Sequence, residues 1–176
     1  MKFNELSKIR QSCRNYDPDR EVEQEKIDAI LETACIAPSA CNGQPYHITV
    51  CQGETAKKVA VACQSFGMNK FLDNAKILIV ISEGKMVTIS KIGSKASQID
   101  YRSIDIGILS AYITSEAADQ GLGSCIIGWL NDKKIREVID LDKPVRLVIA
   151  LGYANPNDVL RNKKRKDLND LVRFRG

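Results

Sequence analysis

The stretch Ile77-Leu78-Ile79-Val80-Ile81-Ser82 indicates the class of fold. Its apolar residues are continuous and mostly β-branched, a pattern typical of a strand that is buried on both faces. Long helical patterns separate this strand from other strand-like segments. The sequence therefore predicts a layered fold of the α+β or α/β class.

The segments on either side extend this pattern. Apolar spacing favours a long helix over 99–120, with Ile104, Ile108, Tyr112 and Ile113 facing inward. Gly121 is predicted to cap the end of this helix. Residues 83–98 carry few large apolar side chains and are predicted to form a mobile flap. Further helices are expected at 4–13 (capped by Asn4), 23–37, 55–64, 132–139 (capped by Asn131) and 168–174, and further strands at 46–51, 124–129 and 145–152.

Length and composition indicate one domain over 1–176. The chain has 176 residues, of which 44% are hydrophobic and 27% charged, as in an ordinary globular protein. No apolar run approaches the roughly 18 residues of a membrane span, so no membrane partner is expected. The first residues lack the apolar core of a signal peptide, which favours a cytoplasmic location.

The positive charge is concentrated near the C-terminus. The formal net charge is +4, and residues 161–166 contribute five positive charges, so the rest of the chain carries −1. Such a run is usually solvated and sometimes binds anions. A nucleic-acid surface would need basic residues spread over a face with exposed aromatics, so no nucleic-acid partner is expected.

The histidine and cysteine content argues against a metal site and a nucleophilic enzyme. The chain has one histidine, His47, and six cysteines, without a Cys-x-x-Cys pair. Cys41, near His47, is only a weak nucleophile candidate, so no catalytic residue is predicted. We expect reduced thiols, with Cys35, Cys51, Cys63 and Cys125 buried because they stand in apolar patterns.

Two polar segments are candidates for ligand binding. In Arg10-Gln11-Ser12-Cys13-Arg14, two guanidinium groups and a hydroxyl converge if the helix stops near residue 12, and forked donors of this kind suit a phosphate. The alternative is a solvated basic helix end. Pro38-Ser39-Ala40-Cys41-Asn42-Gly43-Gln44-Pro45 could let a planar ligand approach its backbone, or could be an ordinary loop between helix and strand.

Together with two later segments, these stretches resemble the FMN-dependent nitroreductase family. The later segments are Gly121-Leu122-Gly123-Ser124-Cys125-Ile126-Ile127-Gly128-Trp129 and Leu151-Gly152-Tyr153. Each motif is weak alone, but they occur in the family's order over nearly the whole chain. The resemblance implies an α+β fold with a central, mostly antiparallel sheet. It also implies a homodimer with FMN at the subunit interface. Residues 153–176, past the last predicted strand, form a long extension that is predicted to wrap the partner subunit; the alternative is a docked or frayed tail.

The resemblance also implies roles for individual residues. Arg10, Ser12 and Arg14 would hold the phosphate and ribityl end of FMN, and Lys163 and Arg165 would complete the phosphate site. Around the flavin, the resemblance implies contacts from Pro38, Ser39 and Asn42 of the other subunit, from Asn69 and Lys70 at the pyrimidine edge, and from Cys125, Ile127 and Gly128 beside the ring.

The implied activity is that of an FMN-dependent NAD(P)H oxidoreductase. NADH or NADPH would reduce the flavin, and an electron-poor acceptor such as a nitroaromatic or a quinone would then be reduced. The cofactor carries this chemistry, while the protein supplies position and charge. The alternatives are a flavin reductase specialised for an enone or a dehalogenation, a flavin sensor or FMN store without turnover, and a non-flavin interaction module that uses the basic tail.

Overall fold

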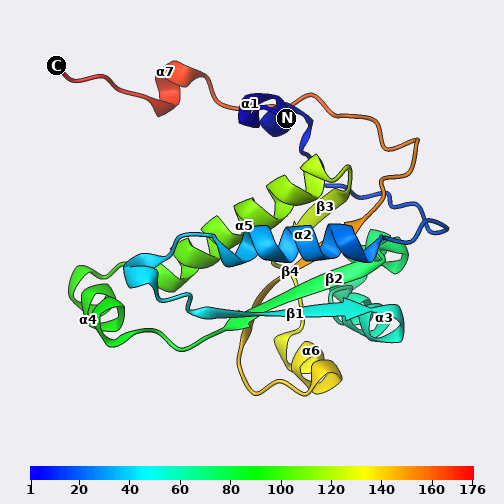
Figure 1. The fold of residues 1–176 in the computed structure, drawn as a ribbon, viewed down its shortest axis with the longest axis horizontal. Helices are drawn as coiled ribbons and strands as arrows, with labels where there is room; N and C mark the ends of the chain where they lie inside the picture. Colours follow the sequence, from blue (N-terminus) through cyan, green and yellow to red (C-terminus); the bar gives the residue numbers. More distant parts are fainter.

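The computed structural model describes residues 1–176, with a four-stranded sheet at its centre (Figure 1). All neighbouring strands are antiparallel, in the order β1-β2-β4-β3. This confirms the predicted α+β class with an antiparallel sheet. The strands are β1 (Tyr46–Gln52), β2 (Ile77–Glu83), β3 (Gly123–Ile127) and β4 (Val145–Gly152).

The central strand β2 is buried on both faces, as its composition predicts. Every residue of Ile77–Ile81 is at most 2% exposed. Ile77, Ile79 and Ile81 pack in one apolar core with residues of α2 (Gln24–Cys35) and α5 (Tyr101–Asp119). Leu78 and Val80 pack in the other core with residues of α3 (Gly53–Ala62) and α6 (Asp132–Ile139). The sheet therefore separates two cores, each covered by a pair of helices.

The remaining helices lie outside these layers. The helix α1 (Phe3–Ile9) packs against α5. The helix α4 (Thr88–Ser97) directly precedes α5 in the chain (Figure 1). The chain beyond β4 runs back past α1 and ends in α7 (Leu168–Leu171), which projects from the body. Three short 3₁₀ helices complete the fold: η1 (Ala40–Asn42), η2 (Ser65–Gly67) and η3 (Lys70–Asn74).

The first helix is shorter than predicted. It begins at Phe3 after Lys2, not after Asn4, and it ends at Ile9 rather than near residue 13. From Arg10 onward the chain is extended because Ser12 forms a parallel β-bridge with Ser124 of β3. Tertiary pairing with the sheet edge thus overrides the local helical pattern.

The two other predicted caps match the structure. The side chain of Asn131 accepts a hydrogen bond from the backbone N–H of Lys134 and caps α6. After α5, Gly121 has φ +76, a conformation that favours glycine, and the Leu122 N–H closes the helix by donating to Ala117 O.

The inward face of α5 was predicted only in part. Ile113 is fully buried, and Ile108 and Tyr112 are half-buried against the core. Ile104 is 50% exposed, so its predicted inward position is wrong for the single chain. The buried stripe runs instead through Ile106, Leu109, Ile113 and Ala117, which leaves Ile104 on the opposite side of the helix.

Two segments near the surface differ from their predicted form. The predicted flap over 83–98 contains the regular helix α4, whose Ile89 and Ile92 side chains are exposed. The C-terminal helix covers only Leu168–Leu171, and Leu168, Leu171 and Phe174 are exposed rather than docked on their own chain.

All six cysteines are free thiols, and four are buried. Cys51, Cys63 and Cys125 lie inside as predicted. The prediction for Cys35 is wrong, because this last residue of α2 faces solvent, whereas Cys13 is buried beside β3. No helix combines the length and the apolarity needed to cross a bilayer. No group of three or more candidate metal ligands is present.

Candidate functional site

A basic hollow of about 380 Å³ lies where the two ends of the chain meet. Its lining contains no hydrophobic residue. We call it the anion cluster, and it is formed by Arg10, Gln11, Ser12, Arg14, Arg161, Asn162, Lys163, Lys164 and Arg165. The structure thus brings together two segments that are separated by most of the sequence.

The N-terminal half of the anion cluster is held against the sheet. The Cys13 N–H donates to Ser124 O at 2.8 Å, beside the bridge between Ser12 and Ser124. A side chain at Gly123 would collide with Cys13, since an added Cβ would lie 2.8 Å from the Cys13 Sγ. Residues 10–14 therefore follow the edge of β3 closely, which places Arg10 and Arg14 on either side of the bridge.

The C-terminal half is attached to the N-terminal half by Gln11. The side-chain amide of Gln11 donates to Val159 O at 3.2 Å, and its Oε1 accepts from the Arg161 N–H at 3.0 Å. Lys163 Nζ donates to Lys8 O at 2.7 Å, which ties the run to the end of α1. Sequence reasoning missed Gln11, although it stands between the two arginines of the motif.

One carboxylate lies close to the anion cluster, and it is already paired. Asp158, whose side chain is 7% exposed, forms an ion pair of 2.8 Å with Arg161. Arg161 also donates to Ser12 O, so it joins the two halves and was likewise missed from the sequence. Arg10, Arg14 and Lys164 form no ion pair. The anion cluster therefore carries uncompensated positive charge, which suits a phosphate.

Strand β3 leads away from the anion cluster along the edge of the sheet. Cys125 and Ile127 are buried in the core, so only the backbone at these positions can reach a ligand outside. Burial raises the pKa of the Cys125 thiol, while Arg14 and the Ser12 hydroxyl act in the opposite direction. Beyond Ser124 no further strand pairs with this edge, which leaves backbone groups available.

A tight turn meets the far end of β3. Asn69, with φ +59, donates its side-chain amide to Cys63 O at 3.0 Å and to Trp129 O at 3.2 Å. These bonds use both donors of the amide, so only Oδ1 remains for a ligand. Lys70 begins η3 directly after this turn and is exposed. The predicted pair Asn69 and Lys70 is thereby brought beside Gly128.

The loop over 38–45 does not join this arrangement within one chain. Its Ala40 N–H donates to the buried Asp105 carboxylate at 2.9 Å, which fixes the loop beside the beginning of α5 and α4. Ser39 Oγ accepts from the Gln44 N–H at 2.9 Å, and Asn42 has φ +51. Pro38, Ser39 and Asn42 do not line the three main hollows that contain Arg10.

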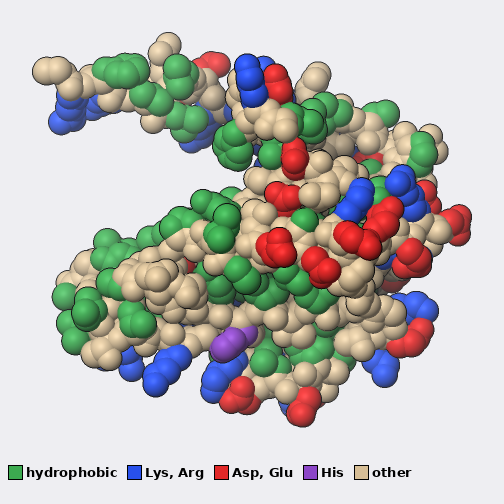
Figure 2. Space-filling model, viewed as in Figure 1, with side chains coloured by type: hydrophobic (Ala, Val, Ile, Leu, Met, Phe, Trp, Pro, Cys, Tyr) green, Lys and Arg blue, Asp and Glu red, His purple; other side chains and the backbone are tan.

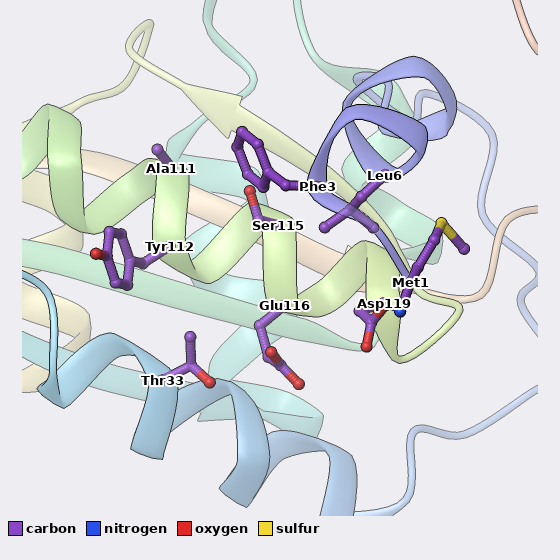
Figure 3. Close-up of a pocket in the computed structure, with 9 residues that line it drawn as sticks. All are labelled: Met1, Phe3, Leu6, Thr33, Ala111, Tyr112, Ser115, Glu116 and Asp119. Carbon is purple, nitrogen blue, oxygen red and sulfur yellow. Dashed lines mark hydrogen bonds and ion pairs between the residues drawn. The ribbon is translucent and has the colours of Figure 1, made fainter.

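A separate apolar hollow of about 480 Å³ lies between α1, α2 and α5 (Figure 3). Phe3 and Leu6 project from α1 toward Ala111 and Ser115 of α5, and Thr33 of α2 closes the other side. None of the predicted cofactor-binding residues lines it. Its lining is mixed, since Glu116 and Asp119 stand beside the apolar side chains.

Comparison with known proteins assigns this chain to a protein family. The model of the nitroreductase family matches residues 8–66 and 61–153. The chain belongs to the nitroreductase family. The oxygen-insensitive NADPH nitroreductase of Helicobacter acinonychis is 26% identical over 94% of both chains. The FMN reductase [NAD(P)H] of Bacillus subtilis is 29% identical over 88% of this chain and 66% of its own length.

A solved nitroreductase gives the same result at the level of structure. The FMN-dependent nitroreductase of Clostridium difficile superimposes with a TM-score of 0.73 at 30% identity, covering 97% of this chain and 98% of its own. The predicted site residues of this nitroreductase fall into three groups. The anion cluster contains Arg10, Ser12, Arg14, Lys163 and Arg165. Asn69, Lys70 and Gly128 lie at the far end of β3, and the loop over 38–45 lies at the beginning of α5.

Proposed function

We propose that this chain is an FMN-dependent NAD(P)H oxidoreductase that transfers electrons from NADH or NADPH to an electron-poor acceptor such as a nitroaromatic or a quinone. The observation that carries the proposal is the anion cluster at one end of an open strand edge. Membership of the nitroreductase family and the names of the relatives agree with it.

The residues present fit FMN. Arg10, Arg14 and Lys164 have no acidic partner, so a phosphate of about −2 charge would neutralise them rather than compete with a carboxylate. Ser12 adds a neutral donor. From this end, the edge of β3 offers backbone groups on the way to Asn69 Oδ1 and Lys70, which suits a polar heterocycle attached to the phosphate by an extended linker.

Bound FMN would supply the hydride and electron transfer chemistry, and the chain would supply orientation and charge. The phosphate contacts fix one end of the cofactor. The ammonium group of Lys70 favours negative charge near its end of β3.

We further propose that the working protein is a homodimer. The loop with Pro38, Ser39 and Asn42 is fixed at the beginning of α5, apart from the anion cluster of the same chain. A second copy related by a two-fold axis could bring this loop to the open edge of β3. Apolar side chains gather over α4 and α5 in Figure 2, and Ile89, Ile92 and Ile104 are exposed there.

The remaining segments fit the same assembly. We assign 153–176 as an extension that wraps the partner, because Leu168, Leu171 and Phe174 are exposed on the single chain. We assign 83–98, with α4, as a cover near the loop over 38–45, since Val87 lies against Gly43. The exposed free thiols Cys35 and Cys41 support a reducing, cytoplasmic location.

An anaerobic titration tests the function. Purified protein is first loaded with FMN, and uptake is followed by quenching of flavin fluorescence. Addition of NADH or NADPH should then bleach the visible flavin absorbance, and a nitroaromatic or quinone should restore it. No uptake of FMN would refute the flavin assignment, and uptake without bleaching would instead indicate a flavin store or sensor.

A further inference from the structure

Two aromatic side chains are exposed together at the far end of β3. The rings of Phe66 and Trp129 meet edge to face, with centroids 6.3 Å apart and an angle of 64° between their planes. Phe66 is 93% exposed and Trp129 is 55% exposed. We call this pair the aromatic corner. Contiguous exposed apolar surface often marks a binding site.

The backbone holds the aromatic corner in place. Phe66 has φ +55, a left-handed conformation that is unusual for a bulky residue. Asn69 also has a left-handed backbone, and its side-chain amide links Cys63 O to Trp129 O. The turn that carries Phe66 is thus bonded to the segment that carries Trp129. Strain of this kind is typical of sites where function requires the conformation.

The aromatic corner lies where the reacting end of the cofactor would be. The bridge between Ser12 and Ser124 marks the anion cluster, and residues 124–128 lead from it at about 3.3 Å per residue to the corner, roughly 13 Å away. In the proposed function, a phosphate at the anion cluster places the ring system of FMN toward Gly128. The aromatic corner would then border the space that an electron acceptor must enter.

The rings of the aromatic corner suit a planar aromatic ligand. Aromatic rings attract one another in offset-stacked or edge-to-face contacts, and Phe66 and Trp129 already meet edge to face. Because Phe66 is 93% exposed, its ring can accept a further aromatic ring.

We propose that Phe66 and Trp129 form the recognition site for a planar aromatic electron acceptor. This inference rests on the proposed function and assigns its acceptor specificity to named residues. Phe66 and Trp129 contribute binding and orientation, and they do not take part in electron transfer.

The first test compares acceptors of different shape. In FMN-loaded protein with saturating NADH or NADPH, Phe66→Leu and Trp129→Leu should raise the KM for a nitroaromatic such as nitrofurazone about 2- to 12-fold, the range of an aromatic contact. The rate with ferricyanide, which is not aromatic, should stay within two-fold. Phe66→Tyr and Trp129→Phe should retain the parent KM, because each keeps an aromatic face.

The second test measures binding without turnover. Trp129 is the sole tryptophan of the chain. Benzoate, an aromatic ligand that accepts no electrons here, should change its fluorescence in a saturable way, and Phe66→Leu should weaken that binding. Phe3→Leu is the matched control, since Phe3 is 72% exposed on α1 and lies in a different hollow.

Several results would overturn the assignment. An unchanged KM for nitrofurazone in both leucine variants would refute the aromatic corner while leaving the proposed function intact. A rise in the KM for NADH or NADPH alone would assign the corner to the electron donor instead. Conversion of the parent dimer to a monomer by Phe66→Leu would place the corner in a subunit interface. A parent that binds no FMN would overturn both proposals.

Discussion

Replacement of Gln11 by alanine should loosen the basic run of the tail and weaken FMN binding. The Gln11 side chain makes two hydrogen bonds to the tail, to Val159 O at 3.2 Å and from the Arg161 N–H at 3.0 Å. Both backbone groups lie in exposed residues, so water replaces the lost partner and no buried group is stranded. The loss is therefore the net value of the two bonds and not a desolvation penalty.

The magnitude follows from those two bonds. Each hydrogen bond contributes about 0.5–1.5 kcal/mol to stability. At exposed positions we take the lower part of this range, so the two bonds together contribute about 1–2 kcal/mol. The ratio of docked to undocked tail then falls roughly 5- to 30-fold. Apparent FMN affinity scales with the docked fraction, so this factor is an upper limit for its decrease. The pairs Arg161–Asp158 and Lys163–Lys8 O remain and keep part of the tail in place.

Two measurements check this effect. Trypsin should cut within 161–166 faster in Gln11→Ala than in the parent, as followed by mass spectrometry, and fluorescence quenching should show weaker FMN binding. Gln24→Ala is the matched control, because Gln24 bonds only to Asp28 on α2, at 2.8 Å. If Gln11→Ala leaves both tail protection and FMN affinity at parent values, the clamp has no role in the anion cluster.

Further predictions concern the anion cluster, the tail and the buried thiols. Arg14→Ala should weaken FMN binding roughly 10- to 100-fold in a fluorescence titration, because a charge-assisted contact is lost. Deletion of 161–176 should weaken FMN binding and also shift the dimer toward monomer in light scattering. Joint replacement of Lys163 and Arg165 by alanine should weaken FMN binding, most strongly at low salt, and leave the dimer intact. Burial raises the pKa of Cys63 from 9.0 to about 12. The unfolded chain therefore loses this proton first, and the free energy of unfolding should fall between pH 9 and 12 by at most about 1.4 kcal/mol per pH unit. Urea titrations over this pH range should show that the free energy of unfolding falls less steeply with pH in Cys63→Ala than in the parent. The same dependence on pH in both proteins would contradict this assignment.

The sequence predicted the elements whose local pattern and tertiary role agree. The run from Ile77 to Ile81 reads as a buried strand because burial on both faces leaves no polar position in it. Asn131 and Gly121 mark helix ends because their caps depend on neighbouring backbone alone. The gathering of Arg10, Ser12 and Arg14 also followed from spacing, once the helix was expected to stop before residue 14.

Other features depend on contacts that spacing does not encode. The helix α1 ends at Ile9 because residues 12 and 13 pair with Ser124, a residue far along the chain. Ile104 is apolar yet exposed, since the core takes the neighbouring stripe through Ile106 and Leu109. Gln11 and Arg161 are ordinary polar residues in the sequence, and only their mutual hydrogen bond reveals that they join the ends of the chain.

The meeting of both chain ends at the anion cluster has a consequence for biosynthesis. A ribosome makes Arg10 and Arg14 well before it makes Arg161 to Arg165. At about 5–20 residues per second, these groups emerge roughly 8–30 s apart. The nascent chain can form both helical layers of the sheet before the second set of cations exists. The complete anion cluster can therefore form only after the segment with Arg161 to Arg165 has been made.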